Sequence, residues 1–197
     1  MKLLSAALTL CCLAMPSWAD MTDLIERYDQ ASWQITDQDQ QLAAFESQLG
    51  ELEAMPETSD VLMWQGAVAA SIARLKGGTS ALGLIKQAKK DLDAAIKADE
   101  ANAMAQAIRG NIFAKAPGWP LSVGSSKKAA ADFADALAAQ PDNILALQGY
   151  GEFLADKGDV EQARIQFKKA LMLSPRQGRE MADAARQKQI QALLDAL

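Results

Sequence analysis

Apolar residues along this chain recur at the spacing of helices rather than strands. An example is the stretch from residue 42 to 52, where they fall three or four positions apart, at Leu42, Phe45, Leu49 and Leu52. Such spacing places apolar side chains on one face of a helix. Ala, Leu, Gln, Lys and Glu, which favour helices, dominate the composition. The alternation of Val, Ile and Thr that indicates strands is scarce. The pattern predicts an all-α protein.

A repeat stands out near the end of the chain. Residues Ala129, Phe133, Ala136 and Pro141 return 34 positions later as Ala163, Phe167, Ala170 and Pro175. The clearest copy begins at Ile144, and a turn at residues 157–159 divides it into two helices. Gly158 suits the left-handed end of the first helix, and Asp159 suits the cap of the second. A period of 34 residues is typical of one helix-turn-helix unit.

In these positions the chain resembles the tetratricopeptide repeat (TPR) family, and the general likeness covers about residues 59–175. The resemblance implies a TPR-like array of antiparallel helix pairs, wound into a right-handed superhelix. Small residues at Gly151 and Ala163 would let the two helices of a pair cross closely. By the same alignment, Gly66 faces Ala88 and Gly110 faces Ala129. The wider spacing of these earlier pairs predicts insertions between the helices, around residues 76–83 and 116–124.

The resemblance implies one helical domain over residues 20–197. A degenerate first unit begins the domain, and one amphipathic helix caps its end. Both are expected to differ from the regular units, because the terminal units of an array have only one neighbour. The expected segments are a degenerate unit at 20–56, units at 59–100, 103–141 and 144–175, and a capping helix at 178–197.

Three further segments resemble a more specific group of proteins within the TPR family. Residues 116–124, 150–154 and 175–179 are similar to those of small exported bacterial TPR proteins. The lengthened inter-helix loop also has a weaker likeness to the T-component proteins of TRAP-type transporters.

The first nineteen residues have the layout of a secretory signal peptide. Lys2 precedes an apolar run over residues 3–15, and small residues at Ser17 and Ala19 precede the expected cut. The alternative, a membrane anchor, needs about 20 apolar residues, which this run lacks. We therefore expect a periplasmic protein that begins at Asp20 and is not inserted in the membrane. Both cysteines lie in the leader, so the mature chain would have no disulfide.

Charge and composition exclude several classes of function. The net charge of −5 and the lack of a basic block argue against nucleic acid. Four basic residues near the C-terminus are interleaved with acidic ones, and we expect them on a solvated helix face: Arg176, Arg179, Arg186 and Lys188. Close acidic pairs are likewise expected in solvent; they are Asp37/Asp39, Glu51/Glu53 and Asp91/Asp93.

Catalytic and metal-binding side chains are few. The chain has no histidine, and its cysteines lie in the leader. The usual proton shuttle, thiol nucleophile and zinc ligands are therefore missing. The composition predicts a protein that is not an enzyme and that uses no metal or cofactor.

By position in the family, the first helix of each pair lines a concave face, which would bind a partner. The residues expected there are Met63, Ala67, Met104, Asn111, Lys115, Leu145, Gln148 and Glu152. Trp119, between two prolines, is a candidate loop anchor for a partner. The alternative, which we favour, is that its ring folds back over neighbouring helices. Trp64 is expected in the core.

These expectations favour an exported, non-enzymatic scaffold or adaptor that binds a segment of another protein of the cell envelope in its concave groove. The alternative is a small-molecule binding module associated with an envelope transporter.

Overall fold

The computed structural model describes the backbone of residues 18–197 and the side chains from residue 21 onward. The predicted signal peptide therefore lies, apart from its last two residues, outside the described part. Over residues 18–197 the chain forms nine helices and no β-strand, which confirms the all-α prediction. The helices are α1 (Trp18–Trp33), α2 (Gln38–Glu53), α3 (Ser59–Lys76), α4 (Ser80–Ala98), α5 (Ala103–Lys115), α6 (Ser126–Ala139), α7 (Ile144–Asp156), α8 (Val160–Leu171) and α9 (Glu180–Asp195).

Most helices begin at a residue whose side chain accepts a hydrogen bond from an amide of the first turn. Asn102 and Asn143 cap α5 and α7 in this way, and Asp159 caps α8 as predicted. The turn before Asp159 is also as expected, because Gly158 has a φ of 82°. The helix ends are thus set by residues that the local sequence identifies.

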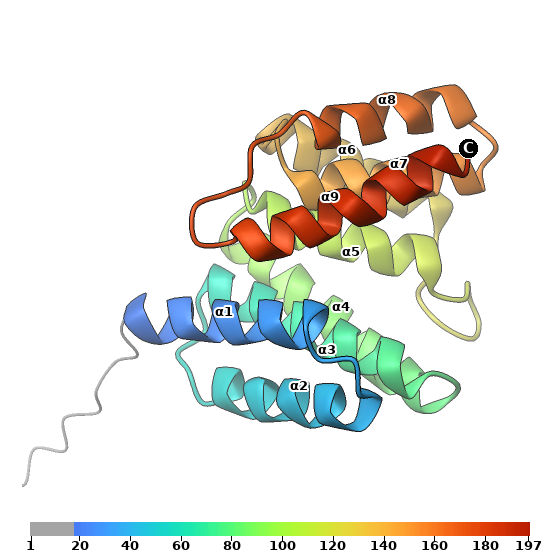
Figure 1. Ribbon diagram of the computed structural model, residues 1–197. Coiled ribbons are helices and arrows are strands. Elements are labelled where there is room, and N and C mark those ends of the chain that lie inside the picture. Colours follow the sequence, from blue (N-terminus) through green and yellow to red (C-terminus); the bar gives the residue numbers. More distant parts are fainter. Residues whose placement is uncertain (1–17) are drawn as a thin grey trace, which may run out of the picture.

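Consecutive helices pack as neighbours (Figure 1). The closest pairs are α3 with α4, α5 with α6 and α7 with α8. The first helices of these pairs also contact one another, α3 with α5 and α5 with α7, so they form a common layer. We call α3, α5 and α7 the inner helices.

Glycines on the inner helices allow this close packing. A Cβ atom on Gly66 would lie 2.6 Å from Cγ of Leu92, and one on Gly151 would lie 2.5 Å from Cε1 of Phe167. A Cβ on Gly110 would lie 3.1 Å from the ring of Phe133. The prediction of tight crossings at these glycines is confirmed. The partner alanines expected from the alignment, Ala88, Ala129 and Ala163, are fully buried.

The insertion predicted around residues 76–83 does not form a long loop. The connection between α3 and α4 is short, and Gly77 and Gly78 turn the chain with φ values of 60° and 56°. The added residues instead make α3 and α4 longer, at 18 and 19 residues against 13 and 12 for α7 and α8. The expectation of a lengthened loop there is wrong, because residues 80–83 continue the helical pattern of α4. The second insertion, at 116–124, is a loop between α5 and α6.

Helix α9 does not simply extend the series. It contacts α8 and α7, and it also contacts α1 from the opposite end of the chain. In Figure 1 the red α9 lies between α1 and α7 and crosses in front of α5. The first and last described helices are therefore in contact, and the inner helices face a space that α1 and α9 border.

Candidate functional site

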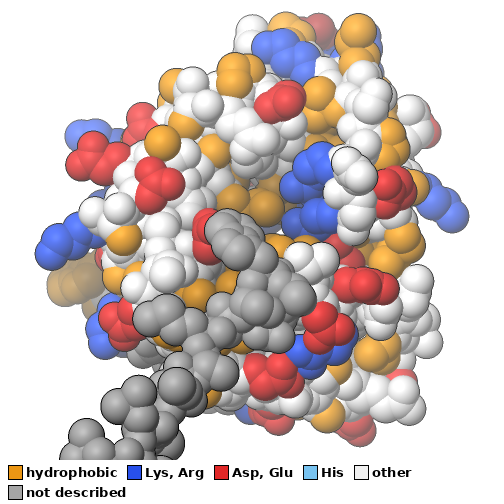
Figure 2. Space-filling view, turned by 90° about the vertical axis from the view of Figure 1, so that its left-hand side faces the viewer, with side chains coloured by type: hydrophobic (Ala, Val, Ile, Leu, Met, Phe, Trp, Pro, Cys, Tyr) orange, Lys and Arg blue, Asp and Glu red, His pale blue; other side chains and the backbone are white. Residues whose placement is uncertain are grey.

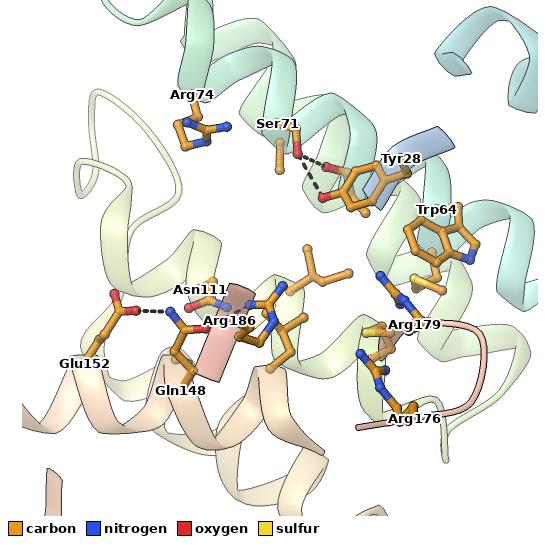
Figure 3. A pocket seen from close by; sticks show the side chains of 17 residues that line it. Tyr28, Trp64, Ser71, Arg74, Asn111, Gln148, Glu152, Arg176, Arg179 and Arg186 are labelled. Carbon is orange, nitrogen blue, oxygen red and sulfur yellow. Dashed lines mark hydrogen bonds between the residues drawn. The ribbon is translucent and has the colours of Figure 1, made fainter. Parts of the chain in front are cut away.

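A cavity of about 310 Å³ lies between the inner helices and the two terminal helices (Figure 3). Each inner helix contributes residues three or four positions apart, which places them on one face. All the predicted concave-face residues line the cavity except Lys115. The lining is Tyr28, Met63, Trp64, Ala67, Ala70, Ser71, Arg74, Met104, Ile108, Asn111, Leu145, Gln148, Gly149, Glu152, Arg176, Arg179 and Arg186.

Lys115 lies beside the cavity rather than in its wall. Its Nζ is 2.7 Å from Oε2 of Glu152 and 3.9 Å from Oδ2 of Asp156. Glu152 in turn accepts a hydrogen bond of 2.9 Å from Nε2 of Gln148. The carboxylate in the lining is therefore already neutralised by a lysine at the edge.

One wall of the cavity is aromatic. The hydroxyl groups of Tyr28 and Ser71 are 3.0 Å apart and hydrogen-bonded (Figure 3). The ring of Tyr28 meets that of Trp64 edge to face, with centroids 5.1 Å apart. Trp64 is 5% exposed, so its predicted place in the core is confirmed, and it also contributes to the cavity.

Arginines from the C-terminal segment form another part of the wall. The solvated face predicted for Arg176, Arg179 and Arg186 is wrong, because all three line the cavity. Arg176 donates from its backbone and from its guanidinium to Asp183, which is buried. Burial alone would raise the pKa of the Asp183 carboxyl, but the bonds from Arg176 outweigh it and keep this pKa below its usual value.

Arg179 reaches across to the first helix. It forms a two-point ion pair with Asp29 of α1, with Nε 2.8 Å from Oδ2. Its guanidinium also lies over the ring of Trp64, 5.4 Å from the centroid. This contact fixes the loop before α9 against α1 and closes that side of the cavity.

Arg186 is half-buried on α9 and donates from Nη1 to Oε1 of Gln148 at 2.8 Å. Its guanidinium also lies 5.3 Å from the ring centroid of Trp33. Among residues 18–197 it forms no ion pair. Burial lowers the pKa of the Arg186 guanidinium, and the nearby charges of Arg179 and Arg176 lower it further, against the smaller opposing effects of Tyr28 and Asp183.

On one face of the molecule, hydrophobic side chains line a hollow and Lys or Arg side chains gather beside it (Figure 2). This local basic character contrasts with the acidic chain as a whole. Sequence reasoning missed Tyr28, Arg74 and the three C-terminal arginines. The regular repeat covers neither α1 nor α9, so no spacing signal linked Tyr28 and the three C-terminal arginines to the inner helices. Arg74 lies on α3, three positions after Ser71, so helical spacing could have identified it.

Two other predictions concern residues away from the cavity. The ring of Trp119 does not fold back, because it is 89% exposed on the loop between α5 and α6. The loop is held instead by its backbone, through bonds from Gly124 N to Pro117 O and from Ser125 N to Phe113 O. Asp91, expected in solvent, is buried on α4 and accepts a bond from Gln87.

The arrangement is suited to binding. Among residues 18–197, no group of three or more His, Cys, Asp or Glu side chains could hold a metal ion. The same residues include no helix of the length and apolar character that a membrane span requires. What the cavity offers is apolar surface, guanidinium groups and amide groups, which recognise a ligand by contact and charge.

Comparison of the chain with protein-family models and with curated proteins finds no match.

Proposed function

We propose that this protein is a non-enzymatic binding protein that holds a segment of a partner protein against its inner helices. The single observation that carries the proposal is the cavity, in which predicted residues from α3, α5 and α7 meet. Apolar surface from Met63, Met104 and Leu145 would supply affinity, and Asn111 and Gln148 would orient the partner.

The finer architecture belongs to the same proposal. Tight glycine crossings in three successive helix pairs support a TPR-like, right-handed array, and the 34-residue period supports it independently. In this proposal α9 is the capping helix. The leader-like first nineteen residues support export to the periplasm, where the partner would be another protein of the envelope.

Site-specific photo-crosslinking tests the partner. A photoreactive residue at Leu145 is expected to capture a protein in intact cells, because Leu145 lines the cavity. The matched control is Ile165, which is exposed on α8 and outside the cavity. Capture from both positions alike, or from neither, would contradict the proposal.

A second function, the binding of a small molecule for an envelope transporter, is favoured by one observation. The ion pair between Arg179 and Asp29 joins the ends of the chain across the groove, and the remaining volume of about 310 Å³ is at the lower end of small-ligand pockets. Native mass spectrometry of the purified protein separates the two functions. A retained small molecule displaced by denaturation supports the second, and a clean apo mass supports the first.

A further inference from the structure

The charges around the cavity do not balance. Four arginines and a single carboxylate, Glu152, line it. Glu152 is paired with Lys115, which lies outside the lining. Asp183 and Asp29, also outside the lining, neutralise Arg176 and Arg179. Within residues 18–197, neither Arg186 nor Arg74 is paired with a carboxylate.

Of these two arginines, Arg186 is the inner one. It is half-buried, whereas Arg74 is exposed at the edge of the cavity. A guanidinium removed from water without an opposite charge destabilises a protein. The bond to Gln148 satisfies part of its hydrogen-bonding capacity but brings no negative charge. A bound anion would supply that charge and accept the remaining donors.

A second polar group lies near Arg186. The side chain of Asn111 packs against α7, where its Oδ1 would lie 2.5 Å from a Cβ on Gly149, the residue after Gln148. Among the described residues the Asn111 amide has no hydrogen-bond partner. Figure 3 shows Asn111, Gln148 and Arg186 on the same side of the cavity. The glycine thus leaves room for an amide next to the unpaired guanidinium.

The remaining surface near these groups is largely apolar and comes from Met63, Met104, Ile108 and Leu145. We infer that the cavity binds the carboxylate of a ligand whose body is apolar, with Arg186 as the counter-charge and Asn111 as a second donor. A single inner guanidinium matches one negative charge, which favours a carboxylate over a phosphate dianion.

The carboxylate could come from a free organic acid or from the chain end of a protein partner. Both sources present the same group to Arg186. The inference rests on the proposed function because it uses the same cavity. It adds the chemical group of the ligand, a carboxylate, that binds there.

Calorimetry and thermal unfolding with straight-chain carboxylic acids of four to ten carbons test the inference. The matched probes are the primary alcohols of equal length, inorganic phosphate, and an apolar peptide with a free or an amidated C-terminus. The acids are expected to raise the melting temperature by mass action, and the alcohols and phosphate are not. The free-acid peptide identifies a chain end as the source if it binds more tightly than the best acid.

Arg186→Gln is expected to weaken acid binding about 10-fold to 100-fold, since a charged hydrogen-bonded contact is lost. The control, Arg164→Gln, removes the same charge from α8, outside the cavity. It is expected to bind the acids as the wild type does.

A second variant does not depend on the stability of Arg186→Gln. Met104→Glu brings a carboxylate into the cavity, where it would compete for Arg186, so acid binding is expected to be lost. The control is Met172→Glu, at an 85% exposed position after α8. Unchanged acid binding by Met104→Glu would overturn the inference.

Equal binding of acids and alcohols, or no binding of any acid or free-acid peptide at about 10 mM, would also overturn it. These failures are distinct from failure of the proposed function. If a photoreactive residue at Leu145 captures a partner but the protein binds no carboxylate, the proposed binding function stands and only the carboxylate inference fails.

Discussion

The Arg179 guanidinium lies against the Asp29 carboxylate, although the two residues are 150 positions apart in the chain. Their side chains are 15% and 5% exposed, so both charges are largely removed from water. The pair joins the loop before α9 to α1 and turns the groove of the inner helices into a cavity. The shape of the site therefore depends on contacts between α1 and the C-terminal segment, of which this ion pair is one and the packing of Arg186 on Trp33 is another.

Asp29→Asn is expected to lower the free energy of unfolding by roughly 3–5 kcal/mol, because it leaves a buried guanidinium without its charge partner. Urea denaturation measures the change. The control is Asp23→Asn in α1, where a 65% exposed carboxylate pairs with Arg27. Its expected cost is below about 1 kcal/mol. Equal effects of the two variants would show that the Asp29 pair does not hold the ends together.

Gly151→Ala is expected to cost about 1–3 kcal/mol, since the new methyl group would overlap the buried ring of Phe167. Gly50→Ala is the matched control on α2, where a Cβ would meet nothing within 4 Å. There the better helix propensity of alanine is expected to stabilise the protein by up to about 1 kcal/mol. Chemical denaturation of both variants measures the contrast. A stabilising Gly151→Ala would contradict the tight crossing of α7 and α8.

Asp91→Asn is expected to stabilise the protein at pH 7. Burial raises the pKa of the Asp91 carboxyl, and Glu53 and Glu57 raise it further, against the opposing effects of Gln87 and Lys90. A raised pKa in the folded state means that stability is lost as the pH rises from the unfolded value, about 3.9, through the folded pKa. The neutral amide avoids this loss and keeps an acceptor for Gln87.

The measurement for Asp91 is the melting temperature of variant and wild type between pH 3 and 7. The difference is expected to be largest at pH 7 and to vanish near pH 3, about one unit below the unfolded pKa, where the wild-type carboxyl is also neutral. Asp135→Asn, at an exposed position of α6, serves as control and is expected to show no such trend. A difference for Asp91→Asn that does not vary with pH would refute the explanation.

Trp119→Ala is expected to change the free energy of unfolding by less than about 0.5 kcal/mol, because the ring is exposed and buries little surface. Acrylamide quenching of tryptophan fluorescence should lose its most accessible component in this variant. Trp64→Ala is expected to cost about 3–5 kcal/mol, since that ring is buried against Tyr28. A large cost for Trp119→Ala would mean that its ring packs on the helices in solution.

The local sequence was sufficient to identify the helical class, the Gly158 turn, the Asp159 cap and the tight glycine crossings. Each of these depends on spacing within one segment or between two neighbouring helices. The concave-face residues could be assigned for the same reason, because residues three or four apart on a helix share a face. Only Lys115, at the end of α5, lies outside the cavity lining.

The sequence by itself thus determined the helices and the residues that face the inner side, since helical periodicity and capping are local properties. Only the tertiary structure decided that α9 returns to α1 and brings Arg179 to Asp29 and Arg186 to Gln148. These two contacts depend on the summed rotation of every helix pair between α1 and α9. No short sequence pattern encodes this sum, so the C-terminal arginines that line the cavity could be identified only from the folded structure.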